Sequence, residues 1–380
     1  MRVAGVVSVV CLVVAAHAVR GEDGTRALMN RIVEPLVRVL PASLEEETFA
    51  DPARREEIGA AVDELADAAA ELGKHATKRD AGFRYLGGSL AQDAARTAER
   101  FARGEYPEAR YALHQMTNTC IVCHSRLPSD RESPLADRLF ARAEVAGLSV
   151  RQRARLQMAT RRFDAALGSY EVLFADPESS PVTFDLGGDL LDYLTISLRV
   201  RRDVERPRAA LARLSARPDV PHYMQRNLRA WLVALPEIQG QLQLAPTVGR
   251  ARILIADGQK ARGYAADRAG VIYDLAASSV LHRYLDSDPE PGAETAEALY
   301  LIGITDAWTQ RSYWVSEAEF ALKTAIRMAP REPVAREAYL LLEEYTVLGY
   351  SGSGGVNVPP DVQAELDELR ALIDMPQVSQ

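Results

Sequence analysis

The chain has 380 residues, 47% of them hydrophobic, so it is long enough to bury the cores of two domains. Its 45 Lys and Arg against 53 Asp and Glu leave a net charge of -8, which excludes the strongly basic composition typical of nucleic-acid-binding domains. With only three cysteines, a small disulfide-stabilised scaffold is excluded as well.

The first 18 residues have the organisation of a secretory signal peptide. Arg2 supplies a positive charge, and an apolar run from Val3 to Ala16 ends in the small-x-small sequence Ala16-His17-Ala18. The run is too short for a membrane-spanning helix, which needs about 20 apolar residues. We therefore expect cleavage after Ala18 and export, with a bacterial periplasm as the compartment. No later stretch is long and apolar enough to predict a membrane span.

Four segments that follow have the hydrophobic periodicity of amphipathic helices. Their expected ranges are 25–40, 52–77, 81–103 and 105–126. Pro35 is expected to bend the first helix, and Asp51 to cap the second, which has Pro52 in its first turn. Because each helix carries one apolar stripe and the connections are short, the pattern predicts an up-down-up-down four-helix bundle over 25–127.

A second helical domain is expected after a linker at 128–137, which is rich in Ser, Asp, Pro and Arg. Over 138–350, pairs of helical segments are separated by Pro and Gly. The expected helices are 153–160, 163–174, 186–198, 207–214, 223–234, 247–255, 265–285, 295–306, 316–328 and 333–347. Such pairs at intervals of a few tens of residues predict an α-solenoid, with an irregular helical domain as the alternative. The predicted fold class is therefore all-α.

Two windows in this region resemble the tetratricopeptide repeat. Phe163-Asp164-Ala165-Ala166-Leu167 resembles the second helix of such a repeat, and Ala298-Leu299-Tyr300-Leu301-Ile302-Gly303 resembles the first. Gly303 is expected to let two helices approach closely. The resemblance implies a surface that binds a protein or a peptide. At 351–380 a Gly- and Pro-rich loop, Ser351 to Pro360, is expected to precede a last helix at 361–373.

The residues with the clearest chemistry are Cys120-Ile121-Val122-Cys123-His124. Cys11 lies in the signal segment, so these are the two cysteines of the mature chain. The spacing is the attachment signal for c-type haem, because Cys120 and Cys123 share a helix face and can each add to a porphyrin vinyl group. His124 then offers its imidazole to the iron. A thiol redox pair would require a strand–helix context, and a zinc site would require a second ligand cluster. We therefore predict one covalently bound haem c.

The segment 25–127 resembles the cytochrome c-prime family. The resemblance is carried by Arg26-Ala27-Leu28-Met29 in the first helix and by Cys120-Ile121-Val122-Cys123-His124 at the end of the fourth. It implies a haem inside the bundle, Cys120 and Cys123 as thioether cysteines, His124 as the proximal ligand, and pairing into homodimers. Family members usually carry a basic residue about four positions past the histidine, where this chain has Pro128.

Further residues are candidates for contacts with the haem. Met29 is the candidate distal iron ligand, and its alternative role is that of a flexible core residue. Met116 is expected to pack against the haem. Arg126 is a candidate contact for a propionate, with a solvated surface charge as the alternative.

The remaining histidines are not expected to bind iron. His75 and His114 are expected at the surface or in contact with the residues that bind the iron. His222 and His282, in the second domain, have no neighbouring cluster of ligands in the sequence. His114 and His124 differ by about 80° around one helix, so a single iron cannot easily bind both.

The sequence shows no acid pair, nucleophile–base set or metal cluster in the second domain, so we expect no catalytic role there. Its aromatic residues are expected in the core more than in a groove: Tyr300, Trp308, Tyr313, Trp314 and Phe320. We predict an electron carrier whose helical-repeat domain docks a redox or scaffold protein, with no nucleic-acid partner. The alternative is a haem module that binds a gas such as NO or CO at an open distal site. A peroxidase-like activity is the least favoured hypothesis, because the sequence shows no acid–base residue for the distal side of the haem.

Overall fold

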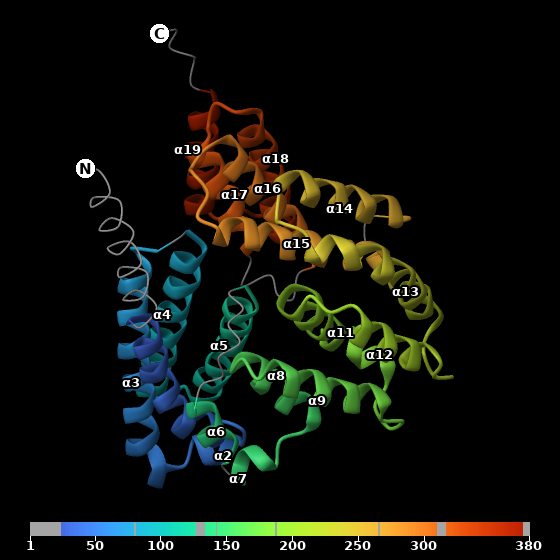
Figure 1. The fold of residues 1–380 in the computed structure, drawn as a ribbon. Helices are drawn as coiled ribbons and strands as arrows, with labels where there is room; N and C mark the ends of the chain where they lie inside the picture. Colours follow the sequence, from blue (N-terminus) through green and yellow to red (C-terminus); the bar gives the residue numbers. More distant parts are fainter. Residues whose placement is uncertain are drawn as a thin grey trace, which may run out of the picture. The chain divides into compact units, whose positions relative to one another are not determined.

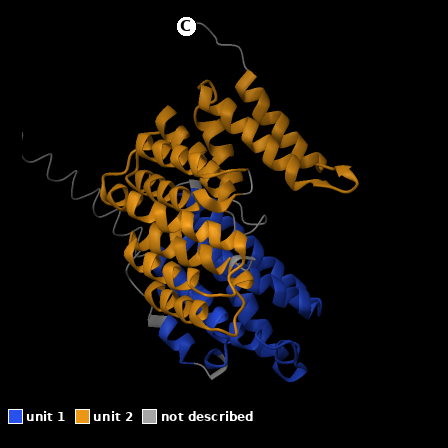
Figure 2. Ribbon diagram, turned by 90° about the vertical axis from the view of Figure 1, so that its right-hand side faces the viewer, with its two compact units in different colours: residues 1–124, 129–162 blue, residues 125–128, 163–380 orange. Residues whose placement is uncertain are grey.

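The computed structural model describes residues 24–79, 81–126, 134–141, 143–186, 188–264, 267–309 and 317–374. These residues are helical almost throughout, which confirms the predicted all-α class; the two strands present there have two residues each. The chain divides into two compact units, residues 1–124 with 129–162, and residues 125–128 with 163–380 (Figure 2). The expected signal segment at 1–18 lies outside the described residues.

The first unit contains the four helices expected from the sequence (Figure 1). They are the helix at 24–42, α3 (Arg55–Ala76), α4 (Ala81–Ala102) and α5 (Tyr106–Arg126). The first runs through Pro35 without a break. Asp51 accepts a hydrogen bond from the Ala53 amide at 2.9 Å, and so caps the short 3-10 helix η1 (Pro52–Arg54) that precedes α3. The short helix α2 (Glu46–Phe49) was not expected.

The pair α3 and α4 is closely packed. Their apolar stripes are buried, as the periodicity predicts, and they include Leu65 and Leu86, each 1% exposed. A Cβ at Gly87 would lie 2.8 Å from Cβ of Ala76, so glycine is needed for this approach. Aromatic rings gather where α4 ends and α5 begins, with Phe101 5.0 Å from Tyr106 between ring centroids.

Three further helices belong to the first unit, α6 (Pro134–Phe140), α7 (Ala143–Ala146) and α8 (Val150–Ala159). Val37 and Leu40, on the helix at 24–42, share a buried cluster with Leu139, Val145 and Leu156. The expected linker at 128–137 is therefore too long, because α6 begins at Pro134. Apolar burial against the first helix explains why 134–162 packs with this unit.

The second unit contains the remaining elements. They are α9 (Phe163–Ala175), α10 (Pro181–Leu186), α11 (Asp189–Leu194), the π-helix η2 (Thr195–Arg201), α12 (Glu205–Ser215), α13 (His222–Gln243), α14 (Val248–Ala261), η3 (Arg268–Gly270), α15 (Val271–Asp286), α16 (Ala293–Trp308), α17 (Glu317–Met328), α18 (Pro333–Gly349), β1 (Ser351–Gly352), β2 (Gly355–Val356) and α19 (Pro360–Asp374). From α14 to α18 each helix packs mainly on its neighbours in sequence, while α19 packs on both α17 and α18. Gly303 makes the expected close approach, since a Cβ there would lie 2.6 Å from Leu322 on α17.

The second unit differs from the sequence expectation in the bounds of several helices and in the glycine-rich segment, and α10 was not expected. The helix expected at 186–198 begins at Asp189 and changes to π-helical geometry at Thr195. The helix α13 continues through Pro236 to Gln243, well past the expected end at 234, with Leu235 and Ile238 fully buried. The glycine-rich segment is an antiparallel hairpin in which Ser351 pairs with Val356, because Gly355 adopts a φ of 101°.

None of the helices in the described parts of the chain is both long and apolar enough to cross a bilayer.

Candidate functional site

The motif Cys120-Ile121-Val122-Cys123-His124 occupies the last turns of α5. At 100° per residue, Cys120, Cys123 and His124 fall within a sector of about 100° of the helix. All three side chains are partly exposed. The helix therefore places two thiols and an imidazole on one side, as attachment to a single porphyrin requires.

The Cys120 thiol does not have the lowered pKa of a redox-active cysteine. Burial, together with the neighbouring Cys123, raises the pKa of the Cys120 thiol to about 12. Redox-active cysteines have a lowered pKa, because the thiolate is the nucleophile. In the part of the chain that the structure describes, the surroundings of Cys120 and Cys123 are helical, without the strand–helix arrangement that a thioredoxin-like site needs.

His124 has the hydrogen bond that an iron-binding histidine needs. Its Nδ1 atom lies 2.7 Å from the carbonyl oxygen of Ala159, the last residue of α8. A carbonyl oxygen only accepts, so Nδ1 carries the proton and Nε2 keeps its lone pair. Burial and the charge of Arg161 lower the pKa of His124 to about 3, so the ring is neutral. Metal-binding histidines usually donate their second ring nitrogen in this way. These residues therefore fit a haem group.

The helix α8 is held against α5 at a second point. Arg155 of α8 donates a hydrogen bond to the side-chain oxygen of Asn118, two residues before Cys120. The start of α8 is closed by a capping box between Ser149 and Gln152. The carbonyl that orients His124 thus belongs to a helix with a defined start and a side-chain anchor on α5.

The two methionines predicted to contact the haem differ in their surroundings. Met116 is 3% exposed and lies on α5 one turn before Cys120, so it belongs to the core of the first unit. Met29 lies near the start of the helix at 24–42 and is partly exposed. The role of Met29 as distal ligand and that of Met116 in haem packing stay predictions.

Arg126 is not a solvated surface charge, the alternative weighed from the sequence. It is 6% exposed and is grouped with the second unit. In that unit burial, then the charge of Arg199 and last that of Arg126 lower the pKa of His282, which keeps this buried imidazole neutral. Its contact with a propionate stays a prediction.

The other two histidines of the first unit hold helices together. His75 lies 2.9 Å from the hydroxyl of Thr25, which joins α3 to the helix at 24–42. His114 lies 2.9 Å from the hydroxyl of Ser43, and burial followed by the charge of Arg110 lowers its pKa. Neither is a simple surface residue, and each already has a structural partner.

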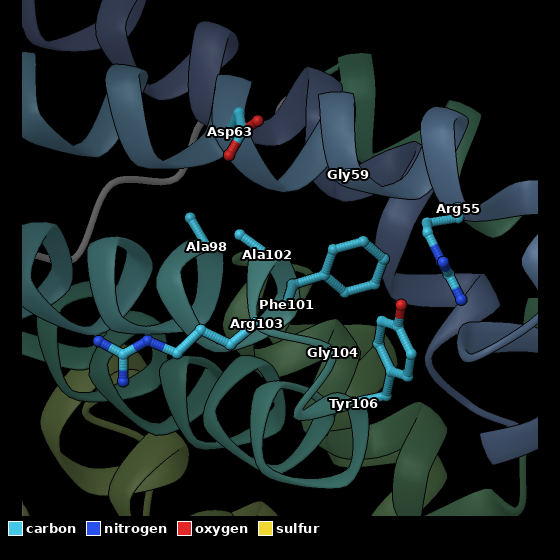
Figure 3. Close-up of a pocket in the computed structure, with 9 residues that line it drawn as sticks. All are labelled: Arg55, Gly59, Asp63, Ala98, Phe101, Ala102, Arg103, Gly104 and Tyr106. Atoms are coloured by element: carbon cyan, nitrogen blue, oxygen red, sulfur yellow. The ribbon is translucent and has the colours of Figure 1, made fainter.

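A cavity of about 480 Å³ lies at the other end of α5 (Figure 3). Its lining residues are Arg55, Gly59, Asp63, Ala98, Phe101, Ala102, Arg103, Gly104 and Tyr106. The rings of Phe101 and Tyr106 lie side by side, with Arg55 over Tyr106 at 5.6 Å. Cys120 lies four turns further along α5, about 21 Å away. This cavity is therefore separate from the motif.

Within the described ranges, no three His, Cys, Asp or Glu side chains come together as a metal site. A haem iron needs no such cluster, since the porphyrin and one or two axial side chains hold it. The sequence did not reveal Ala159 and Arg161 as neighbours of His124. Both lie about 35 residues later in the chain, and neither belongs to a recognisable motif.

The chain matches no protein family, and no curated protein or solved structure shows significant similarity to it.

Proposed function

We propose that this protein is an exported c-type cytochrome that carries electrons by means of one covalently bound haem c. The observation that carries the proposal is the hydrogen bond from Nδ1 of His124 to Ala159, at the end of a Cys-x-x-Cys-His motif. It leaves Nε2 free to bind iron and sets the orientation of the ring.

The residues of the chain have separate roles in this site. Cys120 and Cys123 tether the group through thioethers, so an exported protein does not lose it. His124 is the proximal ligand, and the Ala159 carbonyl holds its tautomer. When bound, the haem supplies reversible one-electron chemistry. Met29 on the distal side would give a His/Met pair, which raises the reduction potential and favours electron transfer over gas binding.

The architecture supports a carrier with a docking domain. In this proposal the helix at 24–42, α3, α4 and α5 form a four-helix bundle of the cytochrome c-prime kind, and the closely packed pair α3 and α4 supports it. The helices α14 to α18 pack mainly on their sequence neighbours, which supports a tetratricopeptide-like solenoid in this proposal. In this proposal the second domain binds a redox or scaffold protein, and the bundle can pair into a homodimer.

The test is expression of the full chain for export, together with a cytochrome c maturation system. We expect a haem mass that survives acid–acetone extraction, and a mature chain that begins after Ala18. Cys120→Ala and Cys123→Ala should each weaken covalent retention, and the double variant should abolish it. A wild-type chain that keeps no porphyrin mass after extraction would remove the proposal.

A titration with CO distinguishes the carrier from the gas-binding alternative. A His/Met site resists CO, because both axial positions are filled. Ready binding of CO to the reduced wild type would favour the gas-binding module over the electron carrier.

A further inference from the structure

Arg161 lies in the turn that joins α8 to α9, two residues after Ala159. Its φ is 63°, in the left-handed region, where residues other than glycine are uncommon. Its amide donates to the carbonyl of Met158 at 3.1 Å. The left-handed residue closes the turn directly after the carbonyl that binds His124, so the backbone that orients the imidazole also sets the position of the Arg161 side chain.

Arg161 follows by two residues the Ala159 carbonyl that lies 2.7 Å from Nδ1 of His124, so its charge lies close to the haem-attachment segment. In agreement, burial and then the charge of Arg161 lower the pKa of His124. The side chain is partly buried, and burial lowers its own pKa, although a guanidinium remains protonated in proteins. No carboxylate of the described residues contributes to this shift. Among the residues that the structure describes, Arg161 thus has no acidic partner, and its positive charge lies near His124.

We infer that Arg161 is a positioning residue of the redox site, whose guanidinium, fixed by the Ala159–Arg161 turn, raises the reduction potential of a haem held by Cys120, Cys123 and His124. The inference rests on the proposed function. It deepens that function, since it assigns control of the potential to a helix pair outside the segment 25–127.

The sign of the effect follows from charge. Uptake of one electron from a donor protein would reduce a bound haem from iron(III) to iron(II) and would lower the net charge of the site by one, with no bond made or broken in the chain. A fixed positive charge nearby favours the state of lower charge, which is the reduced state. In a partly buried site such an interaction is screened far less than in water.

The test is potentiometric titration of the haem-loaded full chain and its variants. Arg161→Asn removes the charge while keeping a residue that tolerates the left-handed conformation. We expect the ratio of reduced to oxidised protein at a fixed applied potential to fall about tenfold, which is a midpoint lowered by about 59 mV for one electron. Arg161→Lys keeps the charge and should retain most of the wild-type midpoint.

Two controls separate charge from structure. Arg103→Asn removes an exposed arginine near the far end of α5 and should leave the midpoint unchanged. Arg161→Gly suits a φ of 63° and should lower the midpoint as Arg161→Asn does, so it replaces that variant if folding fails. A haem-loaded Arg161→Asn variant with the wild-type midpoint potential would overturn the inference. So would an Arg161→Lys variant whose midpoint potential falls as far as that of Arg161→Asn. Absence of haem from the wild type would instead remove the proposed function.

Discussion

Nδ1 of His124 lies 2.7 Å from the carbonyl oxygen of Ala159, a residue 35 positions later in the chain. The bond joins the end of α5 to the end of α8, so the imidazole is oriented by a helix outside the segment that resembles a cytochrome c-prime. A site that the motif places on one helix is thus completed by a second one. Four predictions follow from this structure, in addition to the tests above.

The first concerns the distal side of the iron. Met29→Ala should convert a six-coordinate, low-spin spectrum into a five-coordinate one, lower the reduction potential and permit CO binding, because a thioether ligand stabilises reduced iron. Absorption spectra of both oxidation states measure this. Met116→Leu is the matched control, since it changes a core methionine on α5 and should keep the low-spin spectrum. Identical spectra for Met29→Ala and wild type would remove Met29 as a ligand.

The second concerns the contact between α16 and α17. Gly303→Ala should lower the free energy of unfolding by about 1–3 kcal/mol, because the new Cβ would lie 2.6 Å from Leu322. Gly240→Ala, at an exposed position within α13 with no atom near the new Cβ, should instead raise it by about 0.5–1 kcal/mol. Denaturant unfolding checks both values. Equal changes in the free energy of unfolding for Gly303→Ala and Gly240→Ala would contradict the close approach of α16 and α17.

The third concerns a buried ion pair in the second unit. Arg262 pairs with Asp274, which is fully buried, and lies 4.3 Å from the ring centroid of Trp308. Burial raises the pKa of Asp274 to about 7 against the lowering effect of Arg262. Between about pH 4 and 7 the folded state therefore binds a proton that the unfolded state has released. Stability from this group falls as pH rises through that window.

Asp274→Asn should remove this slope, which amounts to the order of 2–3 kcal/mol between pH 5 and 8. Denaturant unfolding at several pH values measures the difference between wild type and variant. Glu297→Gln, in the more exposed pair with Arg252, should leave the slope unchanged. A wild type and an Asp274→Asn variant with parallel pH profiles would show that the carboxyl titrates normally.

The fourth concerns the contact between α9 and α11. The hydroxyl of Tyr170, fully buried, donates to Oδ2 of Asp192 at 2.9 Å. Tyr170→Phe should lower the free energy of unfolding by about 1–3 kcal/mol, since a buried carboxylate loses a donor. Tyr111→Phe, 61% exposed, should have no measurable effect. A Tyr170→Phe variant as stable as wild type would show that another donor replaces the hydroxyl.

The helices and their bounds could be predicted where hydrophobic periodicity and flanking Gly or Pro residues determine them. The segments expected at 81–103 and 333–347 are helices at Ala81–Ala102 and Pro333–Gly349. Where local and tertiary signals compete, the prediction was wrong. Pro236 argues for a helix end, yet α13 continues past it, because Leu235, Ile238 and Leu242 are fully buried against other helices. The linker expected at 128–137 ends early for the same reason, since Leu139 is buried with Val37.

The sequence by itself determined the all-helical class and the candidate chemistry of Cys120, Cys123 and His124. Periodicity acts over a few residues, and thioether attachment depends only on the spacing of two cysteines. Only the tertiary structure decided what surrounds that motif: the Ala159 carbonyl on His124, Arg161 two residues after that carbonyl, and the burial of Arg126. These contacts join residues distant in the chain, and they arise from how apolar faces pack, which no local pattern records.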